Sequence, residues 1–308
     1  MIEKKPRIVI IAGPTAAGKT AVGLELAEEF GAHIVSADSV QVYRYMDIGS
    51  AKPSLIERAR VPHHMIDIRD PNEYFSAGDY VREGRECIEK ILKKGLIPLV
   101  IGGTGMYIRL LLGGIVSTSP TEPELRKNLR LEEERDGPGV LFKRLARVDP
   151  ESAARIGASN ISRIVRALEV FGLTGRRLSE LQREHAFRDR PYRCLFIYLS
   201  PDRDLLYQRI DNRVDSMVRV GLLEEVGQLH ERGYGPELKS MQSLGYRHMG
   251  MVLAGKMDLD DAIRLMKRDT RRYAKRQLTW FRSEPEGLWS DPQDLSGIQL
   301  MVSDFLGH

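Results

Sequence analysis

The sequence feature that most constrains the fold is the glycine-rich segment "GPTAAGKT", residues 13 to 20. It follows the apolar run "RIVIIAG" (7 to 13), which is typical of a strand buried on both faces, and it precedes a helical pattern from Lys19 to Phe30. Between a strand and a helix, Gly13-x4-Gly18-Lys19-Thr20 predicts a phosphate-binding loop, because backbone N–H groups and the helix N-terminus form a site for phosphate oxygens. Lys19 would add a mobile positive charge, and the Thr20 hydroxyl would reach a phosphate or Mg2+.

Further strand patterns place other polar residues at the same edge of a sheet. "HIVSADS" (33 to 39), "GLIPLVIGGTG" (95 to 105) and "RCLFIYLS" (193 to 200) read as strands, with a helix at about 78 to 93 before the second of them. Strands joined through helices imply a parallel, doubly wound sheet whose ligands bind at the carboxyl ends of the strands. The phosphate loop, Asp38 and Gly102 to Thr104 are therefore expected to meet at one edge.

The residue pattern of the chain changes between residues 121 and 190. This stretch is charged and helical, with breaks at 136–139, 148–150 and 173–175, and it contains no convincing strand. We predict an α/β fold with a P-loop-type parallel sheet core (1–120 and 191–308) flanked by helices, and a mostly helical insertion domain (121–190). After the last predicted strand, Ser200 is expected to cap one long helix that docks on the core through apolar residues, Leu206, Ile210, Val214, Met217, Leu222 and Val226.

Composition excludes several classes of protein. The 308 residues are 42% hydrophobic, with no run of eighteen apolar residues and no signal-peptide pattern, which predicts a cytoplasmic protein that does not contact a membrane. Cys87 and Cys194 form no CxxC pair, which argues against a zinc site. The net charge of +4 is modest, but basic residues cluster at 124–130, at 162–166 and at 264–276, where seven of thirteen residues are Lys or Arg. Three such clusters favour a polyanionic partner.

The strand that would supply a magnesium-binding Asp in an ATP hydrolase ends instead in "LVIGGTG", without a carboxylate. The nearest acid at a strand end is Asp38, which could serve as a metal partner, as a general base or only as a turn residue. Gly102 and Gly103, just before Thr104, would let a ligand approach the backbone closely.

Six segments together carry a resemblance to a known family: "GPTAAGKT", "DSVQVYRYMDIGSAKP" (38 to 53), "VPHHMIDI" (61 to 68), "IGGTGMYIRLLL" (101 to 112), "RALEV" (166 to 170) and "AKRQLTWFR" (274 to 282). In this order and over nearly the whole chain, the sequence resembles the tRNA dimethylallyltransferases, also called tRNA isopentenyltransferases. The resemblance implies transfer of a dimethylallyl group from dimethylallyl diphosphate to N6 of adenine 37 in the tRNA anticodon loop, with release of diphosphate and with Mg2+ as cofactor. A monomer that binds the anticodon stem-loop is expected.

The resemblance also implies roles for individual residues. The catalytic set is Asp38, Lys19, Thr20, Thr104 and Arg213, with Arg209 as the alternative to Arg213 one helical turn away. Thr20 would hold Mg2+ through the diphosphate. The loop that binds diphosphate comprises Gly13, Pro14, Thr15, Ala16, Ala17, Gly18, Lys19 and Thr20, where Ala17 replaces a Ser of many relatives. The implied tRNA contacts are Asp38, Ser39, Val40, Gln41, Thr104, Arg126, Ser162, Arg163, Ile164, Val165, Arg166, Lys275, Arg276 and Gln277, where Ser162 replaces a common Gln.

Three alternatives remain open at this point. An adenylate isopentenyltransferase would share the loop and Asp38 but would act on free AMP, ADP or ATP and would not need a large basic surface. A small-molecule kinase would release ADP from ATP. A non-catalytic RNA-binding protein would carry a vestigial loop that contributes nothing to RNA affinity.

Overall fold

The computed structural model describes residues 5–115, 122–185 and 189–307 apart from residue 285. The chain divides into two compact units, residues 1–112 with 191–308, and residues 113–190. The second unit begins at Gly113 rather than at 121, because α4 (Gly105–Gly113) ends there. The predicted boundary itself, residue 121, lies outside the described residues.

The first unit is built on one parallel sheet of six strands in the order β3-β2-β4-β1-β5-β6. The strands are β1 (Arg7–Ala12), β2 (Ala32–Ser36), β3 (His63–His64), β4 (Ile97–Gly102), β5 (Arg193–Leu199) and β6 (Leu288–Ser290). In the centre, Ile10 lies between Val100 of β4 and Phe196 of β5. The predicted fold class is confirmed, and β3 and β6 are short edge strands that the sequence pattern did not indicate.

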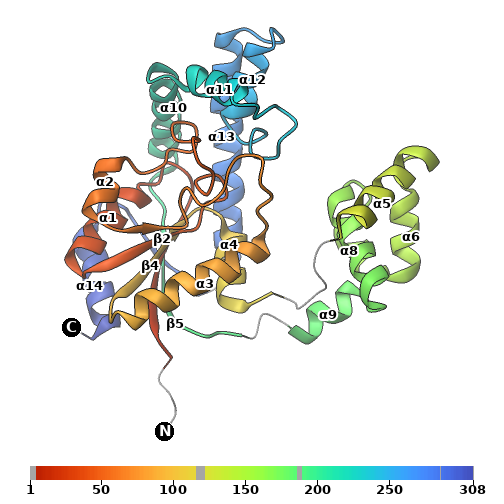
Figure 1. Ribbon diagram of the computed structural model, residues 1–308. Coiled ribbons are helices and arrows are strands. Elements are labelled where there is room, and N and C mark those ends of the chain that lie inside the picture. Colours follow the sequence, from red (N-terminus) through yellow and green to blue (C-terminus); the bar gives the residue numbers. More distant parts are fainter. Residues whose placement is uncertain (1–4, 116–121, 186–188, 285, 308) are drawn as a thin grey trace. The chain divides into compact units, whose positions relative to one another are not determined.

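Helices cover both faces of this sheet (Figure 1). On one face, α1 (Lys19–Glu29) and α14 (Leu295–Leu306) bury Leu24, Leu26 and Ile298 against alternate residues of β1 such as Val9 and Ile11. On the other face, α3 (Ala77–Lys93), α4 and α13 (Leu259–Arg282) pack against the opposite set, including Ile8 and Ile10. β1 is thus buried on both sides, as its continuous apolar run predicts.

The remaining helices of the first unit are α2 (Leu55–Arg60), α10 (Arg203–Arg219), α11 (Leu222–Glu231) and α12 (Tyr246–Leu253). Two expectations were wrong here. Asp202, and not Ser200, caps α10, because its carboxylate accepts the N–H groups of Asp204 and Leu205. The expected single helix is also two helices, since Gly221, with φ of 105°, breaks the pattern between Val214 and Val226.

The second unit is helical throughout its described part. It contains α5 (Pro123–Asp136), α6 (Val140–Val148), α7 (Pro150–Ile156), α8 (Ile161–Thr174) and α9 (Leu178–His185). The predicted breaks coincide with the ends of α5, α6 and α8. Its own small core includes Leu129, Leu141, Leu145 and Ile164, all buried. No helix within the described parts of the chain is long and apolar enough to cross a membrane.

Candidate active site

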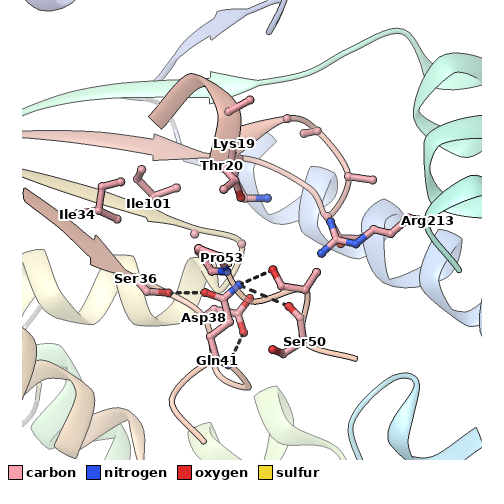
Figure 2. Close-up of a pocket in the computed structure, with 18 of the residues that line it drawn as sticks. Lys19, Thr20, Ile34, Ser36, Asp38, Gln41, Ser50, Pro53, Ile101 and Arg213 are labelled. Atoms are coloured by element: carbon pink, nitrogen blue, oxygen red, sulfur yellow. Dashed lines mark hydrogen bonds between the residues drawn. The ribbon is translucent and has the colours of Figure 1, made fainter. Parts of the chain in front are cut away.

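The loops that follow β1, β2 and β4 meet at the carboxyl edge of the sheet and line a cavity of about 470 Å³. The structure therefore brings together the phosphate loop, Asp38 and the first two glycines of "GGTG". Helices α10 and α13 close the cavity with Arg209, Arg213, Tyr273 and Gln277. Figure 2 shows Lys19, Asp38 and Arg213 around this space.

The phosphate loop has a conformation that glycine makes possible. Gly13 has φ of 151°, and a Cβ there would lie 2.6 Å from the carbonyl oxygen of Leu199 at the end of β5. Gly18 has φ of 92° and precedes α1 without a side-chain cap. The first turn of α1 thus has no side-chain oxygen on its N–H groups and points them toward the cavity rim, as an anion site requires. Ala16 also has positive φ, of 62°.

Lys19 lies folded over its own loop. Its Nζ donates to the carbonyl oxygens of Gly13 at 3.0 Å and Pro14 at 2.6 Å. Burial lowers the pKa of Lys19 to about 7; the positive charge of Arg213 acts in the same direction, and Asp38 partly offsets both. A phosphate group would restore the charged form of this amine.

Asp38 is held by its own turn. Its Oδ1 accepts the backbone N–H groups of Val40 at 2.8 Å and Gln41 at 3.2 Å. Its Oδ2 accepts no hydrogen bond from any residue that the structure describes. The carboxylate is therefore fixed through one oxygen while the other remains available to a ligand.

The loop after Asp38 is fastened by Gln41. The Gln41 side-chain oxygen accepts from the Ser36 hydroxyl at 3.0 Å, and its amide nitrogen donates to the carbonyls of Ser50 and Ala51 at 3.4 and 3.3 Å (Figure 2). The implied tRNA contact through this side chain thus competes with three internal hydrogen bonds.

The loop after Asp38 is also held by hydrogen bonds to Glu225, which the sequence did not indicate. The Glu225 carboxylate, on α11, accepts the backbone N–H groups of Asp47, Ile48 and Gly49 at 3.1, 2.8 and 3.2 Å. It also accepts the Tyr246 hydroxyl at 2.7 Å. A Glu in an amphipathic helix gives no sequence signal for such a contact, because the backbone groups that it binds are about 180 residues away.

Arg213 faces the cavity from α10, and burial lowers its pKa while Asp38 raises it. Arg209, one turn earlier, lines the same cavity. Arg213 alone of the two also lines a second cavity of about 320 Å³, which shares Thr15, Asp38, Ser50 and Tyr273 with the first. Burial, with a smaller contribution from the Asp38 charge, raises the pKa of Tyr273 to about 12. The hydroxyl therefore stays protonated and can donate a hydrogen bond. From the sequence, Tyr273 is one of three aromatic residues near the basic helix that could stack on bases.

The glycines of "GGTG" are required by the protein itself. A Cβ on Gly102 would lie 2.1 Å from the carbonyl oxygen of Ala37, and one on Gly103 would lie 2.3 Å from Nε2 of Gln277. Although Gly102 and Gly103 do line the cavity, their missing side chains admit neighbouring chain segments rather than only a ligand.

Thr104 follows these glycines but lines neither cavity. Its hydroxyl is buried and makes no hydrogen bond within the described chain. The Tyr273 hydroxyl lies near enough for Thr104 to lower the pKa of that phenol, but the pair lacks the geometry of a hydrogen bond.

The basic cluster on α13 is largely neutralised. Five of its seven cations form ion pairs with Asp261, Asp215, Asp269 or Asp211: Arg264, Lys267, Arg268, Arg271 and Arg272. Lys275 and Arg276 are exposed and form no ion pair with any described residue, although the Arg276 guanidinium lies over the Tyr273 ring. Only the end of the cluster thus retains free charge for a polyanion.

Residues implied as tRNA contacts in the second unit fall into two groups. Ser162 and Arg163 are exposed at the start of α8, whereas Ile164 and Val165 are buried in the core of the unit, where their side chains cannot contact RNA. Arg126 and Arg166 both bind Glu169, which is fully buried. Within the described residues, no cluster of three or more His, Cys, Asp or Glu could hold a metal ion.

This fold and this site define a class: an α/β enzyme with a phosphate-binding loop that faces Asp38 across a cavity. Glu57 also lines this cavity, but its carboxylate accepts the N–H and hydroxyl of Ser54. Comparison with known families places the chain within that class. A model of the IPP transferase family matches residues 41–284, and a model described as isopentenyl transferase matches residues 6–69. The chain belongs to the IPP transferase family.

Relatives with high identity extend over almost all of the chain. A tRNA dimethylallyltransferase of Syntrophobacter fumaroxidans is 52% identical over 94% of this chain and 85% of that protein. One from Geobacter metallireducens is 50% identical over 98% of both chains.

Solved structures similar to this chain come from the same family of enzymes. The tRNA isopentenylpyrophosphate transferase of Bacillus halodurans is 37% identical, with a TM-score of 0.74 over 99% of this chain and 97% of that one. A eukaryotic dimethylallyltransferase acting on tRNA is 31% identical, with a TM-score of 0.83 over 94% of this chain and 75% of that one.

Proposed function

We propose that this chain transfers a dimethylallyl group from dimethylallyl diphosphate to N6 of adenine 37 in a tRNA anticodon loop. The observation that carries the proposal is the charge pattern of the 470 Å³ cavity: buried cations, Lys19 and Arg213, lie close to the Asp38 carboxylate without forming an ion pair with it. An anionic leaving group and a nucleophile that loses a proton suit these two kinds of charge. The names of the relatives supply the particular donor and acceptor.

In the proposed reaction the N6 nitrogen forms a bond to the allylic carbon as the bond from that carbon to the diphosphate oxygen breaks. Diphosphate leaves with the bonding electron pair, and the N6 proton goes to Asp38 or to solvent. Negative charge grows on the leaving group, where loop N–H groups, Lys19 and Arg213 would stabilise it. The loop thus assists departure of diphosphate rather than transfer of a phosphoryl group.

Mg2+ fits this arrangement. The Thr20 hydroxyl lies on the cavity, and Asp38 is the carboxylate on the same cavity that the reaction would use. So small a set of protein oxygens suits Mg2+, which keeps several waters and binds through substrate phosphates. When bound, the ion would neutralise charge on the diphosphate.

Asp38 would accept the hydrogen of the N6 amine on Oδ2. An exocyclic adenine amine is a weak nucleophile, so holding it in line with the allylic carbon contributes at least as much as removing its proton. The hydrogen bonds from Val40 and Gln41 to Oδ1 fix the carboxylate for this purpose.

The adenine would enter through the second cavity. This cavity of about 320 Å³ meets the first at Asp38 and Tyr273, and its wall includes apolar residues, Ile210, Val214, Met217, Leu244 and Met266. A base must leave its stack to reach such a place, at a cost of a few kcal/mol that is lowest in an unpaired loop. Exposed cations such as Arg163, Lys275 and Arg276 would bind the RNA backbone. We propose that the enzyme acts as a monomer in the cytoplasm.

One assay tests the proposal. The protein is incubated with dimethylallyl diphosphate, Mg2+ and either AMP or an anticodon stem-loop with adenines at positions 36 to 38, and the product nucleoside is identified by mass. Prenylation of the stem-loop is expected, and its loss is expected when adenine 37 is replaced by guanine. Transfer to AMP alone would instead make this chain an adenylate isopentenyltransferase and overturn the proposal.

A further inference from the structure

We propose that Gln277, on the basic helix α13, is a positioning residue that holds the diphosphate loop in its working conformation. The inference rests on the function proposed above and changes the role of this residue. The resemblance implies a tRNA contact for Gln277, but its side chain is only 7% exposed and points into the protein.

The Gln277 amide joins two loops of the site. Its Oε1 accepts the backbone N–H of Thr15, in the phosphate loop, at 2.9 Å. Its Nε2 donates to the carbonyl oxygen of Gly103, in the loop after β4, at 2.9 Å. Because a backbone N–H can only donate and a carbonyl can only accept, these partners fix the orientation of the amide. A carboxylate of the same length would lose the donor, and Asn would be one methylene too short.

The packing around Gln277 is built for this contact. A Cβ on Gly103 would lie 2.3 Å from Gln277 Nε2, and a Cβ on Gly105 would lie 2.2 Å from the Trp280 ring, one turn further along α13. The Arg109 guanidinium covers that ring at 4.3 Å from its centre. The glycines of "GGTG" thus seat one face of α13 directly on the loop backbone.

Two consequences follow for the site. The Thr15 N–H is already bonded to Gln277, so diphosphate must be bound by other N–H groups of the loop and of the first turn of α1, such as those of Gly18 to Thr20. Tyr273, four residues earlier on the same helical face, lines both cavities. α13 therefore sets the position of the phosphate loop and of Tyr273 together, while Lys275 and Arg276 on the same helix face solvent.

The test separates donor binding from RNA binding. Gln277→Met keeps the length of the side chain and removes both hydrogen bonds. We expect the Kd for dimethylallyl diphosphate and for inorganic diphosphate, measured by calorimetry with Mg2+, to rise about tenfold, the order expected when two hydrogen bonds are lost. The Kd for the anticodon stem-loop should stay within about twofold. Lys275→Met, two residues away and exposed, should give the reverse pattern.

A second variant reaches the same contact from its other side. Gly103→Ala does not change residue 277, but the added methyl group displaces the side-chain amide of Gln277. We expect this variant to bind diphosphate more weakly and still to unfold cooperatively on heating. This variant decides the matter if Gln277→Met fails to fold. Unchanged diphosphate affinity in the folded variants, or an equal loss of stem-loop affinity, would overturn the inference. If wild-type protein binds diphosphate but prenylates no RNA, the proposed function fails instead, and the diphosphate measurements still test Gln277.

Discussion

The two units of this protein differ in whether their buried charged side chains form ion pairs. In the second unit, the Glu169 carboxylate is fully buried and accepts four hydrogen bonds. The donors are Nε and Nη2 of Arg126, both at 2.9 Å, Nη1 of Arg166 at 2.5 Å and the backbone N–H of Glu122 at 2.8 Å. At the cavity of the first unit, Lys19, Arg213 and Asp38 form no ion pair within 4.0 Å in the described chain, and the hydrogen bonds of Lys19 and Asp38 go to backbone groups. One cluster is complete without a ligand and the other is not.

The pKa shifts express the same difference. Burial raises the pKa of Glu169, but hydrogen bonds from Arg126 and Arg166 outweigh it and leave the pKa below the usual value. Lys19 has no compensation of that size, so burial lowers its pKa to about 7. Burying the unpaired Lys19 amine costs free energy, which indicates that a ligand uses this charge. The paired Glu169 cluster needs no ligand, and loss of one of its partners would destabilise the fold. The comparison makes each cluster testable on its own.

The largest effect is expected at Asp38. Asp38→Ala should lower the single-turnover rate of prenyl transfer at least about a hundredfold, the order expected when a general base that also orients its substrate is removed. Asp38→Asn keeps an oxygen that accepts the N–H groups of Val40 and Gln41, but it removes the negative charge. This variant therefore distinguishes the role of the charge from that of the hydrogen bonds within the turn. Both variants should bind the stem-loop normally by filter binding. Normal single-turnover chemistry in Asp38→Asn would show that the carboxylate only shapes the loop.

The complete cluster should respond in stability instead. Arg126→Ala leaves Glu169 buried with Arg166 as its remaining cation, and we expect a loss of about 2 kcal/mol in the free energy of unfolding, somewhat less than for a lone buried pair. Hydrogen exchange in residues 122–184 would locate the loss. Arg135→Ala, which breaks the exposed pair with Asp136, should leave the free energy of unfolding almost unchanged. Equal stability of the two variants would contradict the role given to Glu169.

Sequence patterns predicted the parts of the molecule that local rules determine. The loop pattern gave the phosphate loop, apolar runs gave β1, β2, β4 and β5, and breaks between helical stretches gave the ends of α5, α6 and α8. Asp38 and the loop meet because both follow parallel strands.

The remaining features depend on contacts between residues far apart in the chain. Gln277 reaches Thr15 across 262 positions, and Glu225 reaches the 47–49 loop across 176 to 178. The basic cluster at 264–276 predicted more free positive charge than the structure has, because Asp211 and Asp215 on another helix form ion pairs with cations of α13. Ile164 and Val165 show the limit of transferring a motif whole: the segment is exposed at Ser162 and Arg163 and buried two residues later.

The incomplete cluster also predicts a pH dependence. Lys19 has a pKa lowered to about 7 in the free protein, and bound diphosphate favours the charged amine, so binding takes up a proton above that pH. Affinity for diphosphate should therefore fall as pH rises through about 7, by roughly tenfold between pH 6 and pH 8. Calorimetry in buffers of different ionisation enthalpy measures the uptake. Lys19→Met retains only the titration of diphosphate itself, and an identical profile in both proteins would contradict the assignment.

The smallest effect should come from exposed cations, where the same contrast between paired and unpaired charge applies. Arg163, at the exposed start of α8, forms no ion pair with any described residue, whereas Arg144 in the same unit binds Glu132 at 2.9 Å. If Arg163 contacts a phosphate of the RNA, Arg163→Ala should lower the slope of log Kd against log salt by about one and weaken stem-loop binding a few-fold. Arg144→Ala should leave the slope unchanged. Since neither change removes a buried contact, both proteins should melt like wild type, and an unchanged slope in Arg163→Ala would place the RNA away from the start of α8.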